Sequence, residues 1–117
     1  MRKGREARRS IPAVVLGGTG YVAGELLRLI AGHPTLTLAG IMSDSRPGEP
    51  VGAAFGHLAT VYAQQTFKSQ AQIEAIIERE ESTAIFSAAP HGAAAALIDA
   101  LLTKSEAAGK HPNLFEI

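Results

Sequence analysis

Leu16-Gly17-Gly18-Thr19-Gly20-Tyr21-Val22-Ala23-Gly24 is the stretch that decides the fold of this chain. An apolar run over residues 11–16 precedes it, and a helical pattern over residues 22–31 follows it. A strand, a glycine-rich turn and a helix in this order form a phosphate cradle. Glycines let the backbone approach a pyrophosphate closely, and the new helix directs its unpaired N–H groups and positive dipole end toward the anion.

The glycine turn matches a dinucleotide-binding pattern in two registers. Gly18-x-Gly20-x-x-Ala23 fits the common fingerprint with alanine in the third place, and Gly17-x-x-Gly20-x-x-Ala23 fits a variant of it. The alternative is a tight turn between packed elements. We predict a dinucleotide site because the turn stands between the required strand and helix. The predicted cofactor-binding residues of this turn are Gly17, Gly18, Thr19, Gly20, Tyr21 and Val22.

The length and composition indicate one globular domain. The chain has 117 residues and no apolar run of about 18 residues, and no signal peptide is visible, so we expect a cytoplasmic protein without membrane association. It contains no cysteine, which excludes a disulfide, a thiolate metal site and a cysteine nucleophile within these residues. The four histidines are scattered, so we expect no metal site, and we assign no catalytic residue.

The first residues are strongly basic. Residues 1–9 contain five basic residues and one acidic residue, so the rest of the chain carries a net negative charge. Such a segment could contact nucleic acid or anionic lipid. No aromatic residue stands among the charges to stack on bases, so we predict a flexible, solvated leader over residues 1–10 and no nucleic-acid partner.

The remaining chain alternates strands and helices. The first strand, helix and strand form a βαβ unit, which requires parallel pairing and a right-handed crossover. We therefore predict an α/β, Rossmann-like, doubly wound and mainly parallel sheet with helices on both faces, over residues 11–117 and incomplete. The predicted strands cover residues 11–16, 35–42, 61–67, 83–88 and 114–117, and the predicted helices cover residues 22–31, a short turn at 53–58, 70–80, and 93 to about 108.

The loop after the second predicted strand decides which nicotinamide cofactor is bound. An acidic residue there bonds the ribose 2′-hydroxyl of NAD, whereas an arginine accommodates the 2′-phosphate of NADP. This chain offers both Asp44 and Arg46, and Ser43 and Ser45 add hydroxyl groups. Two serines and an arginine suit a phosphate, so we predict NADP rather than NAD, with Ser43, Ser45 and Arg46 as cofactor-binding residues. The alternative is a solvated polar loop.

A third segment follows the strand predicted at residues 83–88. Ala89, Pro90 and His91 stand there, at the end of a strand where ligands bind in open α/β sheets, and we predict that they contact the cofactor. The alternative for His91 is a hydrogen bond to nearby backbone. We expect His33 and His57 to be structural or surface residues.

With these segments in view, the chain resembles the N-terminal part of the N-acetyl-gamma-glutamyl-phosphate reductases, within the wider semialdehyde dehydrogenase family. The resemblance covers about residues 11–102. The residues that carry it are Gly17-Gly18-Thr19-Gly20-Tyr21, Glu25-Leu26-Leu27-Arg28-Leu29, His33-Pro34, Ser43, Gly48, Pro50-Val51, Phe55, His57-Leu58, Phe86 and Ala88-Ala89-Pro90-His91-Gly92.

The resemblance implies NADPH-dependent reduction of an acyl phosphate to a semialdehyde in arginine biosynthesis. In that family a cysteine thiolate forms a thioester, which hydride then reduces. This chain has neither that cysteine nor the second, catalytic and dimerisation domain, so we expect the cofactor-binding portion of a longer, homo-oligomeric enzyme. The acyl-phosphate substrate would be bound through the missing domain.

Two departures from the family pattern stand in the cofactor site. Many members have arginine directly after the position of Ser43, where this chain has Asp44, so Arg46 would take over the 2′-phosphate. The third glycine of the turn is Ala23, with Gly24 displaced by one position.

Three alternatives remain open from the sequence. One is a related reductase acting on aspartyl phosphate or an aminoadipyl phosphate, and another is a non-catalytic NADP-binding module. The third is an extended short-chain reductase or a redox-sensing NADP-binding regulator. A reductase of that kind requires Tyr-x-x-x-Lys, but Tyr21 and Tyr62 are followed by Glu25 and Thr66 at that spacing.

Overall fold

A computed structural model describes residues 10–17, 20–43, 46–88 and 94–116. The predicted leader thus lies almost entirely outside the described residues. Strands and helices alternate along the chain. In order, they are β1 (Ile11–Leu16), α1 (Tyr21–Ala31), β2 (Leu36–Ile41), α2 (Val51–Ala54), the short 3-10 helix η2 (Gly56–Leu58), α3 (Gln70–Arg79), β3 (Ser82–Ser87), α4 (Ala95–Ala107) and β4 (His111–Glu116).

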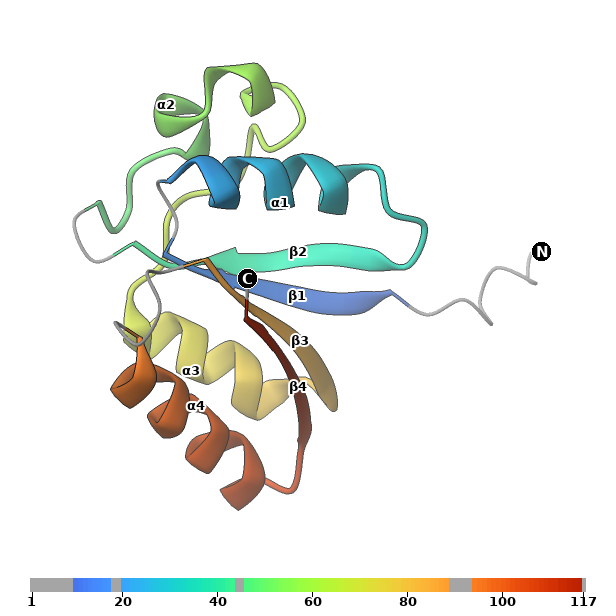
Figure 1. The fold of residues 1–117 in the computed structure, drawn as a ribbon, viewed down its shortest axis with the longest axis vertical. Coiled ribbons are helices and arrows are strands. Elements are labelled where there is room, and N and C mark those ends of the chain that lie inside the picture. The colour runs from blue at the N-terminus through green and yellow to red at the C-terminus, as the bar shows by residue number, and fades with distance from the viewer. Residues whose placement is uncertain (1–9, 18–19, 44–45, 89–93, 117) are drawn as a thin grey trace.

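The four strands form one parallel sheet in the order β2-β1-β3-β4. The chain first moves from β1 to β2 and then crosses to the other side of β1 to add β3 and β4. Helix α1 covers one face of the sheet, whereas α3 and α4 cover the other (Figure 1). This confirms the predicted doubly wound α/β fold, and it places the reversal of strand order between β1 and β3.

Two apolar cores lie on opposite faces of the sheet, because successive side chains of a strand point to opposite sides. Ala13 and Val15 of β1 pack in the core under α1, and Val14 and Leu16 pack in the core under α3 and α4. All four side chains are fully buried. The continuous apolar run of residues 11–16 thus reflects a strand that is covered on both faces.

Helices α1 and α3 begin in different ways. Helix α3 has a capping box, in which the Ser69 side chain accepts a hydrogen bond from the Gln72 backbone and the Gln72 side chain accepts one from the Ser69 backbone. Helix α1 has Gly20 at its N-cap, and no side-chain hydrogen bond caps it among the described residues. Among the described residues, no side chain thus satisfies the first backbone N–H groups of α1 as Ser69 does in α3.

The turn from α1 to β2 depends on His33. Its Nδ1 accepts hydrogen bonds from the backbone N–H groups of Thr35 at 3.0 Å and Leu36 at 3.1 Å. This supports the expectation that His33 is structural. In the described part of the chain, no helix is both long and apolar enough to cross a membrane.

The strand predicted at residues 61–67 is wrong. Tyr62 lies in a turn, where its N–H donates to the Leu58 carbonyl at 3.0 Å and its carbonyl accepts from Gln65 N at 3.0 Å. Only isolated bridges form beyond it, between Thr66 and Pro50 and between Lys68 and Met42. Tyr62 and Phe67 of this segment are buried in the core that they share with α1, whereas Val61 is exposed. The last strand also begins earlier than predicted, at His111.

Candidate functional site

The carboxyl ends of three strands meet at one edge of the sheet. Leu16 at the end of β1 is in register with Ser87 at the end of β3, and the Ala88 N–H donates to the Leu16 carbonyl at 2.9 Å. On the other side of β1, the Met42 N–H donates to the Val15 carbonyl at 2.9 Å. The segments that follow β1, β2 and β3 therefore start side by side, as the sequence predicts.

Glycine stands at different positions of the turn after β1 for different physical reasons. Gly17 has a φ of +82°, a left-handed conformation that glycine adopts without strain. Gly24 is needed for packing, since a Cβ there would lie 3.0 Å from a ring carbon of Phe55. Gly20 shows neither constraint among the described residues: its φ is −86°, and a Cβ there would meet no described atom within 4 Å, its chain neighbours aside. The described residues thus leave space beside the backbone at Gly20.

This open space lies at the uncapped start of α1. The first turn of α1 contains no acidic residue that would repel an anion. Tyr21 and Val22 follow Gly20 with 82% and 39% of their surfaces exposed, so the helix terminus is accessible to a ligand. A glycine N-cap, N–H groups without a side-chain cap among the described residues, and an accessible terminus suit an anion site at a helix start.

The loop after β2 is folded upon itself. Ser43 is buried, and its Oγ accepts a hydrogen bond from the Arg46 backbone N–H at 3.2 Å. The Arg46 side chain remains 43% exposed, with its Nε 4.0 Å from Oε1 of Glu49. Glu49 was not among the predicted site residues. An acidic residue three positions after an arginine was the available signal, but in a loop that spacing does not determine proximity.

The same loop is attached to the segment before α3. The Gly48 N–H donates to the Phe67 carbonyl and the Phe67 N–H donates to the Glu49 carbonyl, both at 2.8 Å. The Lys68 N–H in turn donates to the Ile41 carbonyl at the end of β2, at 2.8 Å. These bonds link the Arg46–Glu49 turn to the carboxyl edge of the sheet.

Helix α1 is also held from its outer side. The Tyr62 hydroxyl donates to the Leu27 carbonyl at 2.7 Å, and Phe55 fills the space beside Gly24. Burial raises the pKa of the Tyr62 phenol above its ordinary value of 10.0. The segment containing α2 and η2 thereby fixes the position of α1, whose N-terminus forms part of the candidate site.

Several predicted site residues lie outside the described part of the chain. They are Gly18, Thr19, Ser45, Ala89, Pro90 and His91. Of the predicted residues that are described, Gly17, Gly20, Tyr21 and Val22 belong to the turn and start of α1, and Ser43 and Arg46 belong to the loop after β2. His57 is exposed on η2.

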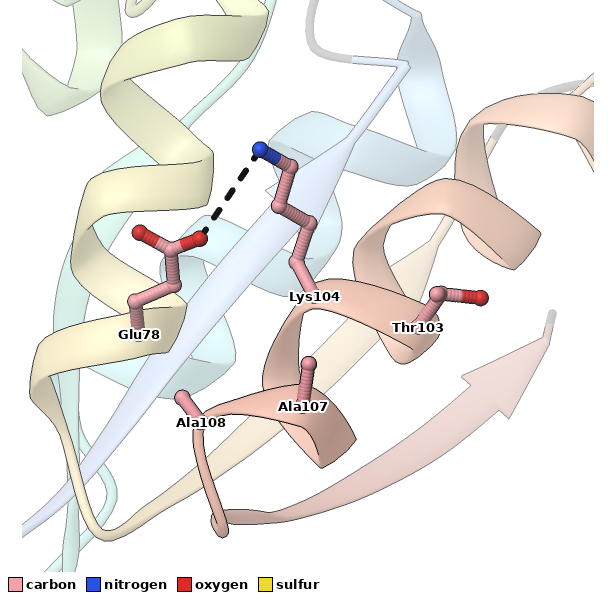
Figure 2. A pocket seen from close by; sticks show the side chains of 5 residues that line it. All are labelled: Glu78, Thr103, Lys104, Ala107 and Ala108. Carbon is pink, nitrogen blue, oxygen red and sulfur yellow. Dashed lines mark ion pairs between the residues drawn. The ribbon is translucent and has the colours of Figure 1, made fainter.

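A separate pocket of about 470 Å³ lies between α3 and α4 (Figure 2). Its lining includes Glu78 and Lys104, whose carboxylate Oε2 and Nζ are 4.0 Å apart. These residues stand near the helix ends that lead into the amino ends of β3 and β4. The pocket is therefore at the opposite edge of the sheet from the glycine turn, and it is not part of the candidate site.

The fold and this edge define a class: a doubly wound α/β domain of the kind that binds ligands outside the carboxyl ends of its strands. Residues 12–108 match the family described as semialdehyde dehydrogenase, NAD binding domain. The chain belongs to this family, which confirms the resemblance drawn from the sequence and identifies a nicotinamide cofactor-binding domain.

Curated relatives agree with this assignment. N-acetyl-gamma-glutamyl-phosphate reductase of Nitrosococcus oceani is 36% identical over 81% of this chain and 26% of its own length. The enzyme of the same name from Acidothermus cellulolyticus is 42% identical over 71% of this chain and 23% of its own length. A putative LysW-L-2-aminoadipate/LysW-L-glutamate phosphate reductase of Haloarcula marismortui is 36% identical over 83% of this chain and 25% of its own length. The chain thus spans about a quarter of the length of these relatives.

Among solved structures, biliverdin reductase of Synechocystis sp. PCC 6803, in complex with biliverdin and NADP+, aligns with 89% of this chain and 37% of its own chain. The TM-score is 0.42 and the sequence identity is 15%.

Proposed function

We propose that this chain binds NADP at the start of α1 and the loop after β2, as the cofactor-binding portion of a reductase. The reaction that the relatives' names support is reduction of N-acetyl-gamma-glutamyl phosphate to the semialdehyde. The observation that carries the binding proposal is Gly20. Neither its backbone conformation nor its neighbours among the described residues require a glycine, and a ligand that approaches the backbone closely would require one.

Two parts of the chain would bind two different phosphate groups of the cofactor. The uncapped first turn of α1 would bind the pyrophosphate through its backbone N–H groups. The Arg46 guanidinium would bind the 2′-phosphate by charge-assisted hydrogen bonds. The bound cofactor supplies the hydride, whereas the chain holds and orients it. A nucleophilic cysteine is absent from these 117 residues, so we expect nucleotide binding without turnover from this chain alone.

Replacing Gly20 with leucine tests the site at the start of α1. We expect loss of NADP binding in calorimetry, because the new side chain would occupy the space assigned to the pyrophosphate. The fold should persist, since a Cβ there meets no atom of the described residues within 4 Å, its chain neighbours aside, and loss of the glycine N-cap costs at most about 1 kcal/mol. Gly32→Leu is the matched control: Gly32 is the C-cap of the same helix and also has open space around it. Unaltered NADP binding by Gly20→Leu would contradict the proposal.

Replacing Arg46 with alanine tests the choice of NADP over NAD. We expect NADP affinity to fall by roughly 10–100-fold, the range for losing hydrogen bonds to a charged group, with NAD affinity nearly unchanged. Lys104→Ala is the control, since it removes one positive charge near the opposite edge of the sheet. Equal losses for the two nucleotides would remove Arg46 from the 2′-phosphate site.

A second candidate substrate is a LysW-linked L-2-aminoadipyl or L-glutamyl phosphate. The Haloarcula marismortui relative, at 36% identity, supports it. The cofactor site would be the same for both substrates, so nucleotide binding does not separate them. An activity assay with each acyl phosphate, on a reductase that contains these residues, separates the two substrates.

A further inference from the structure

We propose that Ser43 is a positioning residue, which sets the preference for NADP over NAD by holding Arg46 in place rather than by contacting the phosphate. This inference rests on the proposed function, since it assumes that Arg46 binds the 2′-phosphate. It differs from the sequence-based prediction, in which Ser43 itself is a cofactor ligand.

The first argument is the use that the loop makes of the Ser43 side chain. Ser43 is 6% exposed, and its Oγ accepts the Arg46 backbone N–H at 3.2 Å. The backbone N–H of Ser43 donates to the Lys68 carbonyl at 3.3 Å, which ties the residue to the segment before α3. The hydroxyl therefore acts within the loop, as serine side chains commonly do in turns.

The second argument is that Arg46 is held from its other side as well. The Glu49 N–H donates to the Arg46 carbonyl at 3.1 Å, closing a turn that contains Gly48 with a φ of +87°. Gly48 and Glu49 both pair with the backbone of Phe67. The backbone of Arg46 is thus fixed by Ser43 before it and by this paired turn after it.

The third argument is that the backbone of Arg46 is fixed while its side chain stays accessible. The Arg46 side chain is 43% exposed, so the guanidinium is open to a ligand from solvent. Binding a phosphate orders a long side chain, and a backbone that is already in place reduces the conformational freedom that binding must remove. Losing the Ser43 hydroxyl would release one of the two anchors without touching the guanidinium.

A double-mutant cycle distinguishes this role from direct binding, because residues that act through one another give non-additive effects. The variants are Ser43→Ala, Arg46→Ala and the two combined, with NADP and NAD affinities measured by calorimetry. We expect Ser43→Ala to weaken NADP binding by roughly 3–10-fold, the loss that one hydrogen bond typically produces, and to leave NAD affinity within about twofold. In the Arg46→Ala background, Ser43→Ala should cause no further loss.

Two further variants keep the interpretation clear. Ser43→Thr retains a hydroxyl oxygen at the same position and should therefore retain most of the NADP preference. If Ser43→Ala acted only through a general loss of stability, the threonine hydroxyl would not be expected to restore this preference. Ser82→Ala is the matched control, since its hydroxyl donates to the His111 carbonyl at 3.1 Å at the amino end of β3. It should leave both affinities unchanged.

The outcomes that overturn the inference are separate from those that overturn the proposed function. The same NADP loss from Ser43→Ala in both backgrounds would make Ser43 a direct ligand and overturn the inference alone. Equal losses of NADP and NAD would also overturn it, by showing a general effect on the fold. If the unmodified chain binds neither nucleotide, or if Arg46→Ala does not discriminate between them, the proposed function fails and the inference fails with it.

Discussion

At the scale of single residues, the charges beside Arg46 determine what its guanidinium can bind. Glu49 places a carboxylate oxygen 4.0 Å from the Arg46 Nε. Both side chains are about half exposed, and such a pair contributes little to stability. In the proposed site, however, the carboxylate would compete with the 2′-phosphate for the same cation. Its negative charge would also repel the phosphate.

Replacing Glu49 with glutamine is therefore expected to strengthen NADP binding by roughly threefold, since removal of a nearby like charge at an exposed position is worth about 0.2–1 kcal/mol. NAD affinity should not change. Calorimetry at low and high salt checks the prediction, because the gain should shrink as salt screens the exposed charges. Weaker NADP binding by Glu49→Gln would show instead that the carboxylate orients Arg46.

The residues of the candidate site could be selected from the sequence, but the structural reason for each residue could not. The pattern around Gly17 and Gly20 predicts a phosphate turn, because strand, glycines and helix are adjacent in sequence. The reason for Gly24 is a ring of Phe55, 31 positions away, which no local pattern reveals. The assignment of Ser43, Arg46 and the other turn residues to cofactor binding stays a prediction.

At the scale of elements, the position of helix α1 is fixed by packing against a segment outside the candidate site. The segment with α2 and η2 packs on it through Phe55, Leu58 and Tyr62, which share a core with Leu27 and Ile30. The strand predicted at residues 61–67 failed for this reason. Its aromatic and β-branched residues favour a strand locally, but a hydrogen bond from Tyr62 to Leu27 and burial against α1 decide the structure.

The Tyr62 hydroxyl gives a prediction for the attachment of this segment. Tyr62→Phe should lower the free energy of unfolding by about 1 kcal/mol at pH 7, because one buried hydrogen bond is lost. The unfolded chain ionises this phenol near pH 10.0, whereas burial keeps it neutral to higher pH in the folded chain. The folded state then binds more protons, so stability falls as pH rises above about 10.

Denaturant unfolding from pH 7 to pH 11 tests both parts of this prediction. The alkaline loss of stability should be smaller in Tyr62→Phe than in the unmodified chain. Tyr21→Phe, at a side chain that is 82% exposed, is the control for removing a tyrosine hydroxyl. Identical alkaline profiles for Tyr62→Phe and the unmodified chain would show that the Tyr62 phenol does not couple to folding.

At the scale of the whole molecule, the parallel sheet could be predicted from the sequence, but the beginning of its edge strand β4 could not. Apolar runs separated by helical patterns predict parallel, doubly covered strands, and the structure confirms them for β1, β2 and β3. The beginning of β4 was missed because Pro112 and Asn113 disfavour a strand in sequence. Proline is tolerated in a strand at the edge of a sheet, and β4 occupies such an edge in the described sheet.

This edge leads to a prediction about association of the 117-residue chain. Phe115 is 48% exposed on β4, its ring stacked on Phe86 at a centroid distance of 5.1 Å, and the formal net charge is zero at pH 7. An exposed edge strand, an apolar side chain and no net charge each favour association between copies. We expect the sedimentation coefficient to rise with protein concentration at neutral pH, and Phe115→Lys to suppress that rise.

Leu29→Lys separates the edge from the charge. Leu29 is 56% exposed on α1, away from β4, and its replacement adds the same single positive charge. If the β4 edge drives association, Phe115→Lys should abolish the concentration dependence and Leu29→Lys should leave most of it. Circular dichroism verifies that both variants fold, because losing the contact with Phe86 is worth only about 1 kcal/mol. An equal effect of the two variants would mean that net charge, rather than the open edge beside Phe115, governs association.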